Sequence, residues 1–380
     1  MTSALSGLRE RARKNLDPVH YDFFAGGAGE EVALAENERA FHALALLPRV
    51  LRGAAERDLR VTLPGARASL PVIVSPTAFH RLAHPDGELA TARAVAAADT
   101  VLVTGVASTI AVGEVTAAAR AVRDEASVWF QLYLHPEQDV TTALVRRAER
   151  AGCSALVVTV DSPVFGRRER DRRNGFHDLP PGLAAENMRD LPGAAPGKPL
   201  DIAMSPALSW DHLRRLRDVT ALPVVLKGVL HPEDAALAVT EGVDALLVSN
   251  HGGRQLDAAP ATVEALPAVV SAVAGRVPVL LDGGVRGGSD VAKALALGAT
   301  AVGIGRPVLW GLAAEGAQGV RQVLELLRAE FDNVLALCGG RSPADLTRDL
   351  VVARATAATA AWGTSVGPQA VRAGEGSMPW

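Results

Sequence analysis

Short apolar segments recur along the chain, and segments with the apolar period of a helix lie between most of them. Eight apolar segments of four or five residues have the composition of buried strands. They occupy residues 72–75, 100–104, 128–132, 156–160, 224–227, 245–249, 279–282 and 301–304. Helical periodicity is found at residues 87–98, 140–151, 235–241 and 290–297. This alternation predicts an α/β protein with a parallel (β/α)8 TIM barrel.

A doubly wound sheet is the competing architecture. It would need a phosphate-binding fingerprint after the first strand, and the sequence SPTA at residues 75–78 is not one. The barrel is therefore the better interpretation. It predicts that functional residues lie at the C-terminal ends of the strands.

Three parts of the chain depart from the repeat, although we expect the whole chain to be one domain. The pattern of residues 1–57 predicts a helical N-terminal segment. A glycine turn interrupts it, and a further helix is expected over residues 33–45. Residues 163–209 form a long interval with many prolines after the fourth strand, and we expect a mobile lid over the site. Residues 363–380 are rich in glycine, serine and proline and predict a flexible tail.

Composition narrows the class of protein. Aromatic residues make up only 4% of the chain, so the core must consist mainly of Ala, Val and Leu. A net charge of −3 argues against a nucleic-acid partner, which would require a basic face. Cys153 and Cys338 are far apart and predict buried reduced thiols and a cytoplasmic protein. No apolar run long enough to cross a membrane is present, and we expect neither a membrane anchor nor a bound metal.

Residues 249–257 read SNHGGRQLD and follow the sixth predicted strand. The imidazole of His251 can accept a proton near neutral pH, and the guanidinium of Arg254 can bind a carboxylate through two hydrogen bonds. Asp161, after the fourth strand, is the natural partner that orients the His251 ring and stabilises its protonated form. A His-x-x-Arg pair alone is also compatible with an ordinary polar loop.

Two glycine-rich segments follow the seventh and eighth strands. Residues 282–290 read DGGVRGGSD, and residues 303–307 read GIGRP. In barrels these two loops commonly form a phosphate site, in which backbone N–H groups and an arginine face the anion. The pattern predicts the phosphate of a cofactor or substrate, although several barrel families share it.

Polar residues at other strand ends are further candidates. Lys227 closes a buried strand, which suggests an anionic or carbonyl partner, although it could also reach solvent at the barrel rim. Gln131 and Tyr133 share one face of their strand, either as ligands or as packed side chains. Arg168 lies at the root of the lid segment and is either a solvated residue or a second arginine for a substrate carboxylate.

Taken together, these segments resemble the FMN-dependent 2-hydroxy acid oxidases and dehydrogenases, over roughly residues 16–350. The matching segments are YD at 21–22, EN at 36–37, PTA at 76–78, HPDGE at 84–88, QLY at 131–133, TVD at 159–161, GRRE at 166–169, KG at 227–228, SNHGGRQLD at 249–257, DGGVR at 282–286 and IGRP at 304–307. The resemblance implies FMN as the cofactor. It assigns FMN binding to Pro76, Thr77, Ala78, Gln131, Thr159, Lys227, Ser249, Asp282, Gly284, Arg286, Gly305 and Arg306. It assigns the substrate to Tyr133, Arg168, His251 and Arg254, with His251 as the base.

Two departures from the family bear on the substrate. Phe23 stands where the family usually has a tyrosine that contacts the substrate carboxylate. Ala107 stands where glycolate oxidase has a tryptophan over the pocket, and Val106 replaces a serine that contacts the flavin. These exchanges suit a substrate larger than glycolate and look most like the 4-hydroxymandelate oxidase branch.

The resemblance implies oxidation of an (S)-2-hydroxy acid, mandelate-like or otherwise larger than glycolate, to the 2-oxo acid. Oxygen is the expected acceptor, with hydrogen peroxide as product, and a homotetramer is expected. The base could take either the hydroxyl proton or the α-carbon proton. The alternatives are a lactate- or glycolate-type oxidase or dehydrogenase, a flavin-binding isomerase, and a barrel that only binds a ligand.

Overall fold

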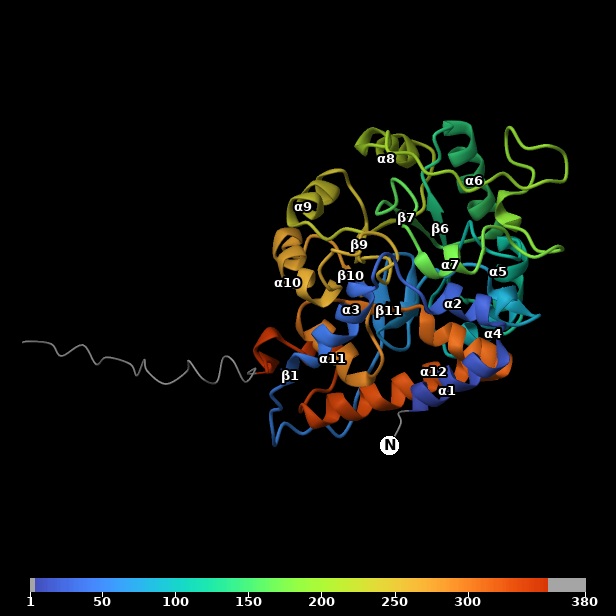
Figure 1. Ribbon diagram of the computed structural model, residues 1–380. Helices are drawn as coiled ribbons and strands as arrows, with labels where there is room; N and C mark the ends of the chain where they lie inside the picture. The colour runs from blue at the N-terminus through green and yellow to red at the C-terminus, as the bar shows by residue number, and fades with distance from the viewer. Residues whose placement is uncertain (1–3, 355–380) are drawn as a thin grey trace, which may run out of the picture.

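The computed structural model describes residues 4–354, and the predicted tail at residues 363–380 lies outside them. Eight parallel strands form a closed barrel in sequence order, and the last pairs with the first (Figure 1). The strands are β4 (Val72–Val74), β5 (Leu102–Gly105), β6 (Val128–Tyr133), β7 (Ala155–Thr159), β8 (Val224–Lys227), β9 (Ala245–Val248), β10 (Val279–Asp282) and β11 (Ala301–Ile304). The predicted (β/α)8 barrel is thus confirmed.

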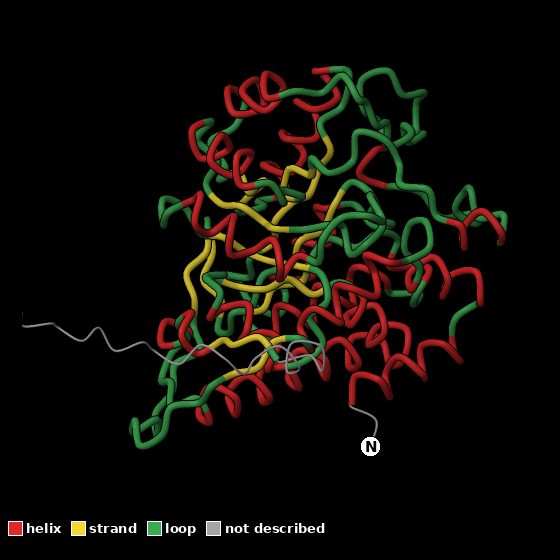
Figure 2. The backbone as a smooth tube through the Cα atoms, turned by 60° about the vertical axis from the view of Figure 1, so that its left-hand side comes forward, coloured by secondary structure: helices red, strands yellow, loops and turns green. Residues whose placement is uncertain are grey.

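Helices surround the barrel, as Figure 2 shows in red around the yellow strands. The helices that follow successive strands are α4 (Gly87–Ala97), α5 (Val112–Arg120), α6 (Gln138–Ala151), α8 (Trp210–Asp218), α9 (Pro232–Thr240), α10 (Thr262–Val273), α11 (Gly288–Ala296) and α12 (Arg306–Leu337). Strand side chains alternate between two cores because successive residues point to opposite faces. Ile73, Val103 and Trp129 fill the barrel interior, whereas Val72, Leu102 and Phe130 pack against the helices.

A hairpin precedes the first barrel strand. It is formed by β2 (Val61–Leu63) and β3 (Ala66–Ala68), which pair in antiparallel register. Its side chains Leu63 and Ala68 are buried in the same cluster as the barrel interior. The hairpin therefore closes the interior at the end of the barrel opposite the functional face.

The N-terminal segment contains three helices, α1 (Ala4–Asn15), α2 (Pro18–Ala25) and α3 (Val32–His42). The apolar stripe of α1 is buried, and the helix packs along α12. The expected helix over residues 33–45 ends at His42, so this prediction was wrong at its C-terminal end. Leu44–Leu46 instead forms β1, because it pairs with β12 (Val351–Ala353). Because the partner strand is so distant in the sequence, no pattern near residues 44–46 predicts this pairing.

Helix α12 consists of two halves joined at Glu315 and Gly316, whose backbone angles are not helical. The halves approach each other closely at Gly311 and Gly319. A Cβ atom added to either glycine would meet the backbone of the other. Only glycine therefore allows this contact between the two halves.

The lid segment, residues 163–209, contains α7 (Glu169–Arg173) and a 3₁₀ turn, Glu186–Met188. Its root is tied to neighbouring parts of the barrel. The Gly166 N–H donates to Gln255, and the Arg170 guanidinium bonds both Asp22 and Glu31. These ties join the lid segment to the N-terminal helices.

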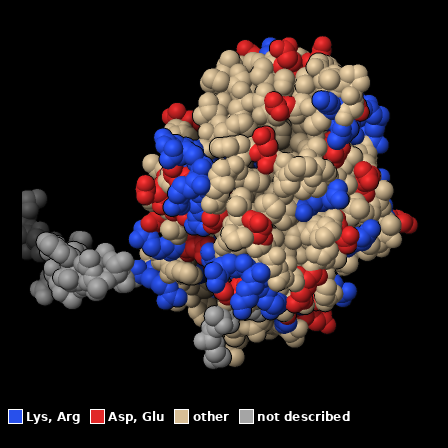
Figure 3. All heavy atoms as spheres, turned by 45° about the vertical axis from the view of Figure 1, so that its right-hand side comes forward, with Lys and Arg blue, Asp and Glu red and all other residues tan. Residues whose placement is uncertain are grey.

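Charges of both signs are mixed on the face drawn in Figure 3. Both cysteines, Cys153 and Cys338, are buried and unpaired, as the sequence predicted. Burial raises the pKa of the Cys153 thiol to about 12. Within residues 4–354, no helix combines the length and the apolar character needed to cross a membrane.

Candidate active site

A cavity of about 900 Å³ opens at the C-terminal end of the barrel strands. This volume falls in the range of pockets that hold cofactors and small molecules. The site residues predicted from the sequence that line it are Phe23, Pro76, Thr77, Ala78, Ala107, Tyr133, Arg168, Lys227, His251, Arg254, Asp282, Gly284, Arg286, Gly305 and Arg306. The barrel therefore brings most of the predicted residues together around one space.

His251 lies just beyond β9, in a backbone conformation that is rare for a residue with a side chain. Its φ is 57°, and Gly252 and Gly253 continue the left-handed turn with φ of 63° and 75°. A Cβ atom on Gly253 would lie 2.5 Å from the Leu34 backbone nitrogen, so the turn fits against α3 only with glycine. Non-glycine residues with positive φ are concentrated at functional sites.

The protonation state of His251 follows from its neighbours. Its Nδ1 atom lies 2.9 Å from Asp161 Oδ1, and Lys227 Nζ lies 3.8 Å from the other carboxylate oxygen. Burial acts to raise the pKa of Asp161, but His251 and Lys227 outweigh it and hold that pKa far below its ordinary value. Burial lowers the pKa of His251, against the opposing effect of Asp161. A neutral His251 therefore donates Nδ1–H to Asp161, which leaves Nε2 free to accept a proton.

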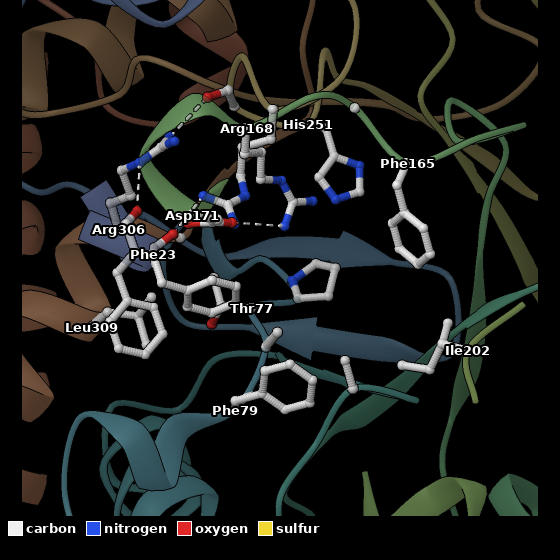
Figure 4. Close-up of a pocket in the computed structure, with 18 of the residues that line it drawn as sticks. Phe23, Thr77, Phe79, Phe165, Arg168, Asp171, Ile202, His251, Arg306 and Leu309 are labelled. Carbon is white, nitrogen blue, oxygen red and sulfur yellow. Dashed lines mark hydrogen bonds and ion pairs between the residues drawn. The ribbon is translucent and has the colours of Figure 1, made fainter. Parts of the chain in front are cut away.

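Arg168 and Arg254 line the same cavity as His251, and Figure 4 labels Arg168 beside the His251 ring. The Arg254 guanidinium donates to the backbone oxygens of Phe23 and Gly26 and lies 5.1 Å from the centre of the Phe23 ring. The Nε atom of Arg168 is buried and has no hydrogen-bond partner. Burial lowers the pKa of both guanidiniums, and their mutual repulsion adds to the shift of Arg254. This part of the cavity is therefore suited to an anion.

The loops after β10 and β11 form another part of the wall. Asp282 accepts a hydrogen bond of 3.0 Å from Ser75, while its second oxygen, Oδ1, is buried without a partner. Arg286 pairs with Glu38 at 2.9 Å. Arg306 also lines the cavity, and its guanidinium donates to the backbone oxygens of Phe24, Gly26 and Gly252. Arg306 thus ties α2 to the barrel.

Four of the predicted residues do not line the cavity. Asp161 lies behind His251, and its contacts are described above. Gln131 donates to Thr159 through a buried hydrogen bond of 3.0 Å, and Ser249 accepts from the His251 backbone N–H at 3.1 Å. These side chains belong to the buried layer that supports the site.

The cavity also contains residues that the sequence analysis missed. Phe79, Phe165, Phe176, Leu309 and Asp171 line it, and Figure 4 labels four of them. The Phe23 ring contacts Phe79, with ring centres 6.0 Å apart, and Phe176, with ring centres 5.0 Å apart. The available signal was the presence of aromatic residues in a chain that has few of them.

Fold and cavity define the class as a (β/α)8 barrel with one histidine and two arginines of the predicted substrate site in the same cavity. A family model described as FMN-dependent dehydrogenase matches residues 12–353. The chain belongs to this family, and it is an FMN-dependent oxidoreductase.

Individual relatives agree with this assignment. Glycolate oxidase 1 of Oryza sativa subsp. indica is 46% identical over 345 residues, which cover 89% of this chain and 92% of the relative. L-lactate oxidase of Nostoc sp. is 47% identical over 337 residues, covering 86% and 92% of the two chains. A solved structure of mandelate oxidase with 3,3-difluoro-2-hydroxy-3-phenylpropionic acid has a TM-score of 0.84 and 43% identity, covering 92% of this chain and 98% of its own.

The cavity meets the chemical requirements of FMN. The unpartnered Oδ1 atom of Asp282 can accept a hydrogen bond from a hydroxyl group such as those of the ribityl chain. Gly283 and Gly284 have φ of 95° and 86°, so the backbone turns beside the cavity without a Cβ atom. Arg286 provides a positive charge on the same loop.

Proposed function

We propose that this protein oxidises an (S)-2-hydroxy acid with an aryl side chain, such as mandelate, to the 2-oxo acid. The observation that carries the proposal is the contact of His251 with Asp161, in the same cavity as Arg168 and Arg254. A base beside two cationic groups is the arrangement that a hydroxy carboxylate requires.

Each of these residues has a defined part in the proposed reaction. Arg254 and Arg168 bind the substrate carboxylate, and the Tyr133 hydroxyl holds the substrate beside them. His251 Nε2 accepts the proton that the substrate loses, and Asp161 stabilises the imidazolium that forms. FMN, when bound, would accept the two electrons and the second proton removed from the substrate.

Further residues are proposed to hold FMN. Asp282 and Arg286 bind the ribityl and phosphate groups, together with backbone groups of Gly284 and Gly305. Pro76, Thr77 and Ala78 line the ring site, and Gln131, Thr159 and Ser249 are assigned to the buried edge of the ring. Lys227 supplies a positive charge where the reduced ring would gather negative charge. Arg306 lines the same cavity, and it is assigned to the phosphate as well.

The aryl preference is supported by the walls of the cavity. The Phe23 ring contacts both Phe79 and Phe176, and the three rings present an apolar aromatic surface. Ala107 adds little bulk to the wall. Aromatic pairs in offset or edge contact are favourable, so a phenyl ring can join this surface at low cost. The resemblance to mandelate oxidase supports the same substrate class.

Anaerobic titration of the purified yellow protein tests this proposal. Mandelate, 4-hydroxymandelate, lactate and glycolate are added in turn, and reduction is followed as loss of flavin absorbance. We expect the two aryl acids to reduce the flavin with the highest kcat/KM. Faster reduction by lactate or glycolate would contradict the aryl assignment, and no reduction by any of them would contradict the whole proposal.

The acceptor, the compartment and the assembly are part of the same proposal. We infer that oxygen re-oxidises the cofactor and yields hydrogen peroxide, as oxidases named among the relatives suggest. Two buried, unpaired thiols support a cytoplasmic location, and a homotetramer is proposed from the family resemblance. We further propose that the lid segment moves during turnover. Peroxide formation tests the acceptor, light scattering tests the tetramer, and limited proteolysis with and without substrate tests the movement of the lid segment.

A further inference from the structure

A carboxylate lies inside the part of the cavity that gathers positive charge. Asp171 is on α7 of the lid segment and lines the cavity, with only 15% of its side chain exposed. Its Oδ2 atom lies 3.9 Å from an Arg168 guanidinium nitrogen, and Figure 4 shows the two side chains pointing toward each other. Burial raises the pKa of Asp171, while Arg254 and Arg168 oppose that shift. Asp171 is thus the resident anion beside the arginine pair.

The other charges around the pair are opposed by other groups. Arg306 also lines the cavity and acts on Arg254, but its own charge is opposed by Glu38 and Glu31. Lys227 is balanced by Asp161, with which it pairs at 3.8 Å. Arg254 makes its hydrogen bonds to neutral backbone oxygens, so they supply no counter-charge. At the rim, Arg167 and Arg172 pair with Glu169, and both arginine side chains are largely exposed to solvent.

A charge count follows for this region of the cavity. Arg168 and Arg254 contribute two positive charges, and Asp171 contributes one negative charge. One positive charge is left for a ligand. A single carboxylate neutralises it, whereas a second carboxylate would enter a region with no remaining cation and with the Asp171 charge close by.

We propose that Asp171 limits the site to ligands with one carboxylate and so excludes 2-hydroxy dicarboxylic acids. This inference rests on the proposed function, because it assigns the substrate carboxylate to Arg168 and Arg254. Asp171 acts as a specificity-determining residue through charge. The Asp171 charge does not distinguish aryl from alkyl monocarboxylates. This selection by charge is therefore independent of the aryl preference proposed for the aromatic residues of the cavity.

The test measures the binding of two inert acids to the FMN-loaded enzyme by the change in flavin absorbance. Propionate carries one carboxylate, and malonate carries two on a skeleton of the same length. We expect Asp171→Asn to lower the Kd of malonate relative to that of propionate by about tenfold. Asp171→Glu keeps the charge and should keep the selectivity of the unmodified protein. Asp178→Asn is the matched control, because Asp178 lines the same cavity but is exposed.

Three results would overturn the inference. The first is an unchanged ratio of the malonate Kd to the propionate Kd in Asp171→Asn. The second is weaker binding of both acids in that variant, which would indicate that Asp171 only positions Arg168. The third is an equal change of the ratio in Asp178→Asn. If Asp171→Asn does not retain FMN, Asp171→Ser provides the neutral variant. Failure of the proposed function has a different signature. There, no 2-hydroxy acid reduces the unmodified enzyme, while the selectivity between malonate and propionate can still be measured.

Discussion

The Nδ1 atom of His251 lies 2.9 Å from Oδ1 of Asp161, although 90 positions separate the two residues in the chain. They follow β9 and β7, which are not neighbours, because β8 lies between them. Lys227, the last residue of β8, lies 3.8 Å from the same carboxylate. The closed barrel itself therefore holds the base and its partner in place.

Replacing His251 with alanine tests the base directly. Because His251 belongs to the proton-transfer machinery and not to the Asp282 loop, His251→Ala should retain FMN. We expect the rate of flavin reduction by mandelate to fall about 10²- to 10⁴-fold. Stopped-flow absorbance under anaerobic conditions measures this rate. Reduction at the unmodified rate would remove His251 from its proposed role.

The pH dependence of kcat/KM should report the His251 pKa. Burial lowers this pKa below its ordinary value of 6.5, and only the neutral imidazole can accept a proton. Activity should therefore be present above the pKa and fall as the pH drops through it, with a midpoint below 6.5. In Asp161→Asn the carboxylate that raises this pKa is lost, so the midpoint should move to lower pH. A midpoint that moves upward in this variant contradicts the assignment.

Asp282 is expected to contribute to FMN affinity through its unpartnered Oδ1 atom. Asp282→Asn keeps the shape of the side chain but removes its charge, and hydrogen bonds to charged groups contribute about 1.5–3 kcal/mol. We expect FMN to dissociate with a Kd raised about tenfold or more, measured by fluorescence of released flavin. Asp201→Asn is the control, because Asp201 lines the same cavity in an exposed position. Equal loss in both variants would argue against a specific contact.

Phe23→Tyr restores the hydroxyl that the resemblance places at this position. Phe23 lies beside Arg254 and is largely buried, so the new hydroxyl would face the proposed carboxylate site. A hydrogen bond contributes about 0.5–1.5 kcal/mol, which corresponds to a KM for glycolate lowered by up to about tenfold. Steady-state kinetics with glycolate and mandelate provide the measurement. An unchanged KM for both acids would show that this position does not reach the carboxylate.

A stability prediction concerns the contact between the two halves of α12. Gly319→Ala places a methyl group against the Gly311 backbone and should lower the free energy of unfolding by about 1–3 kcal/mol. Gly113→Ala is the matched control, because nothing lies within 4 Å of the added methyl group and Gly113 is in α5. The control should be neutral or stabilising, since alanine favours helix. Denaturant unfolding of both variants decides the point.

The sequence predicted the barrel and the polar residues at its strand ends because both depend on local patterns. His251, Lys227 and Asp282 each follow or close an apolar run, and the closed order of strands brings them to one face. The pairing of His251 with Asp161 was predicted from the chemistry of the two groups, and the structure places them in contact.

Other features depend on contacts that no local pattern encodes. The side chain of Arg306 turns toward the backbone oxygens at the end of α2, because that helix packs beside its loop. Asp171 and Phe176 enter the cavity only because the lid segment folds back over the barrel. Leu44–Leu46 is extended because its partner strand, Val351–Ala353, lies near the other end of the described chain.

That pairing of β1 with β12 has a consequence for synthesis on the ribosome. Residues 44–46 leave the exit tunnel long before their partner has been translated, and α1 likewise waits for α12. The early segment must therefore remain unpaired while the barrel strands emerge, and its docking is a late event. The folding nucleus is thus expected among the central strands, with the two ends of the chain fastened together last.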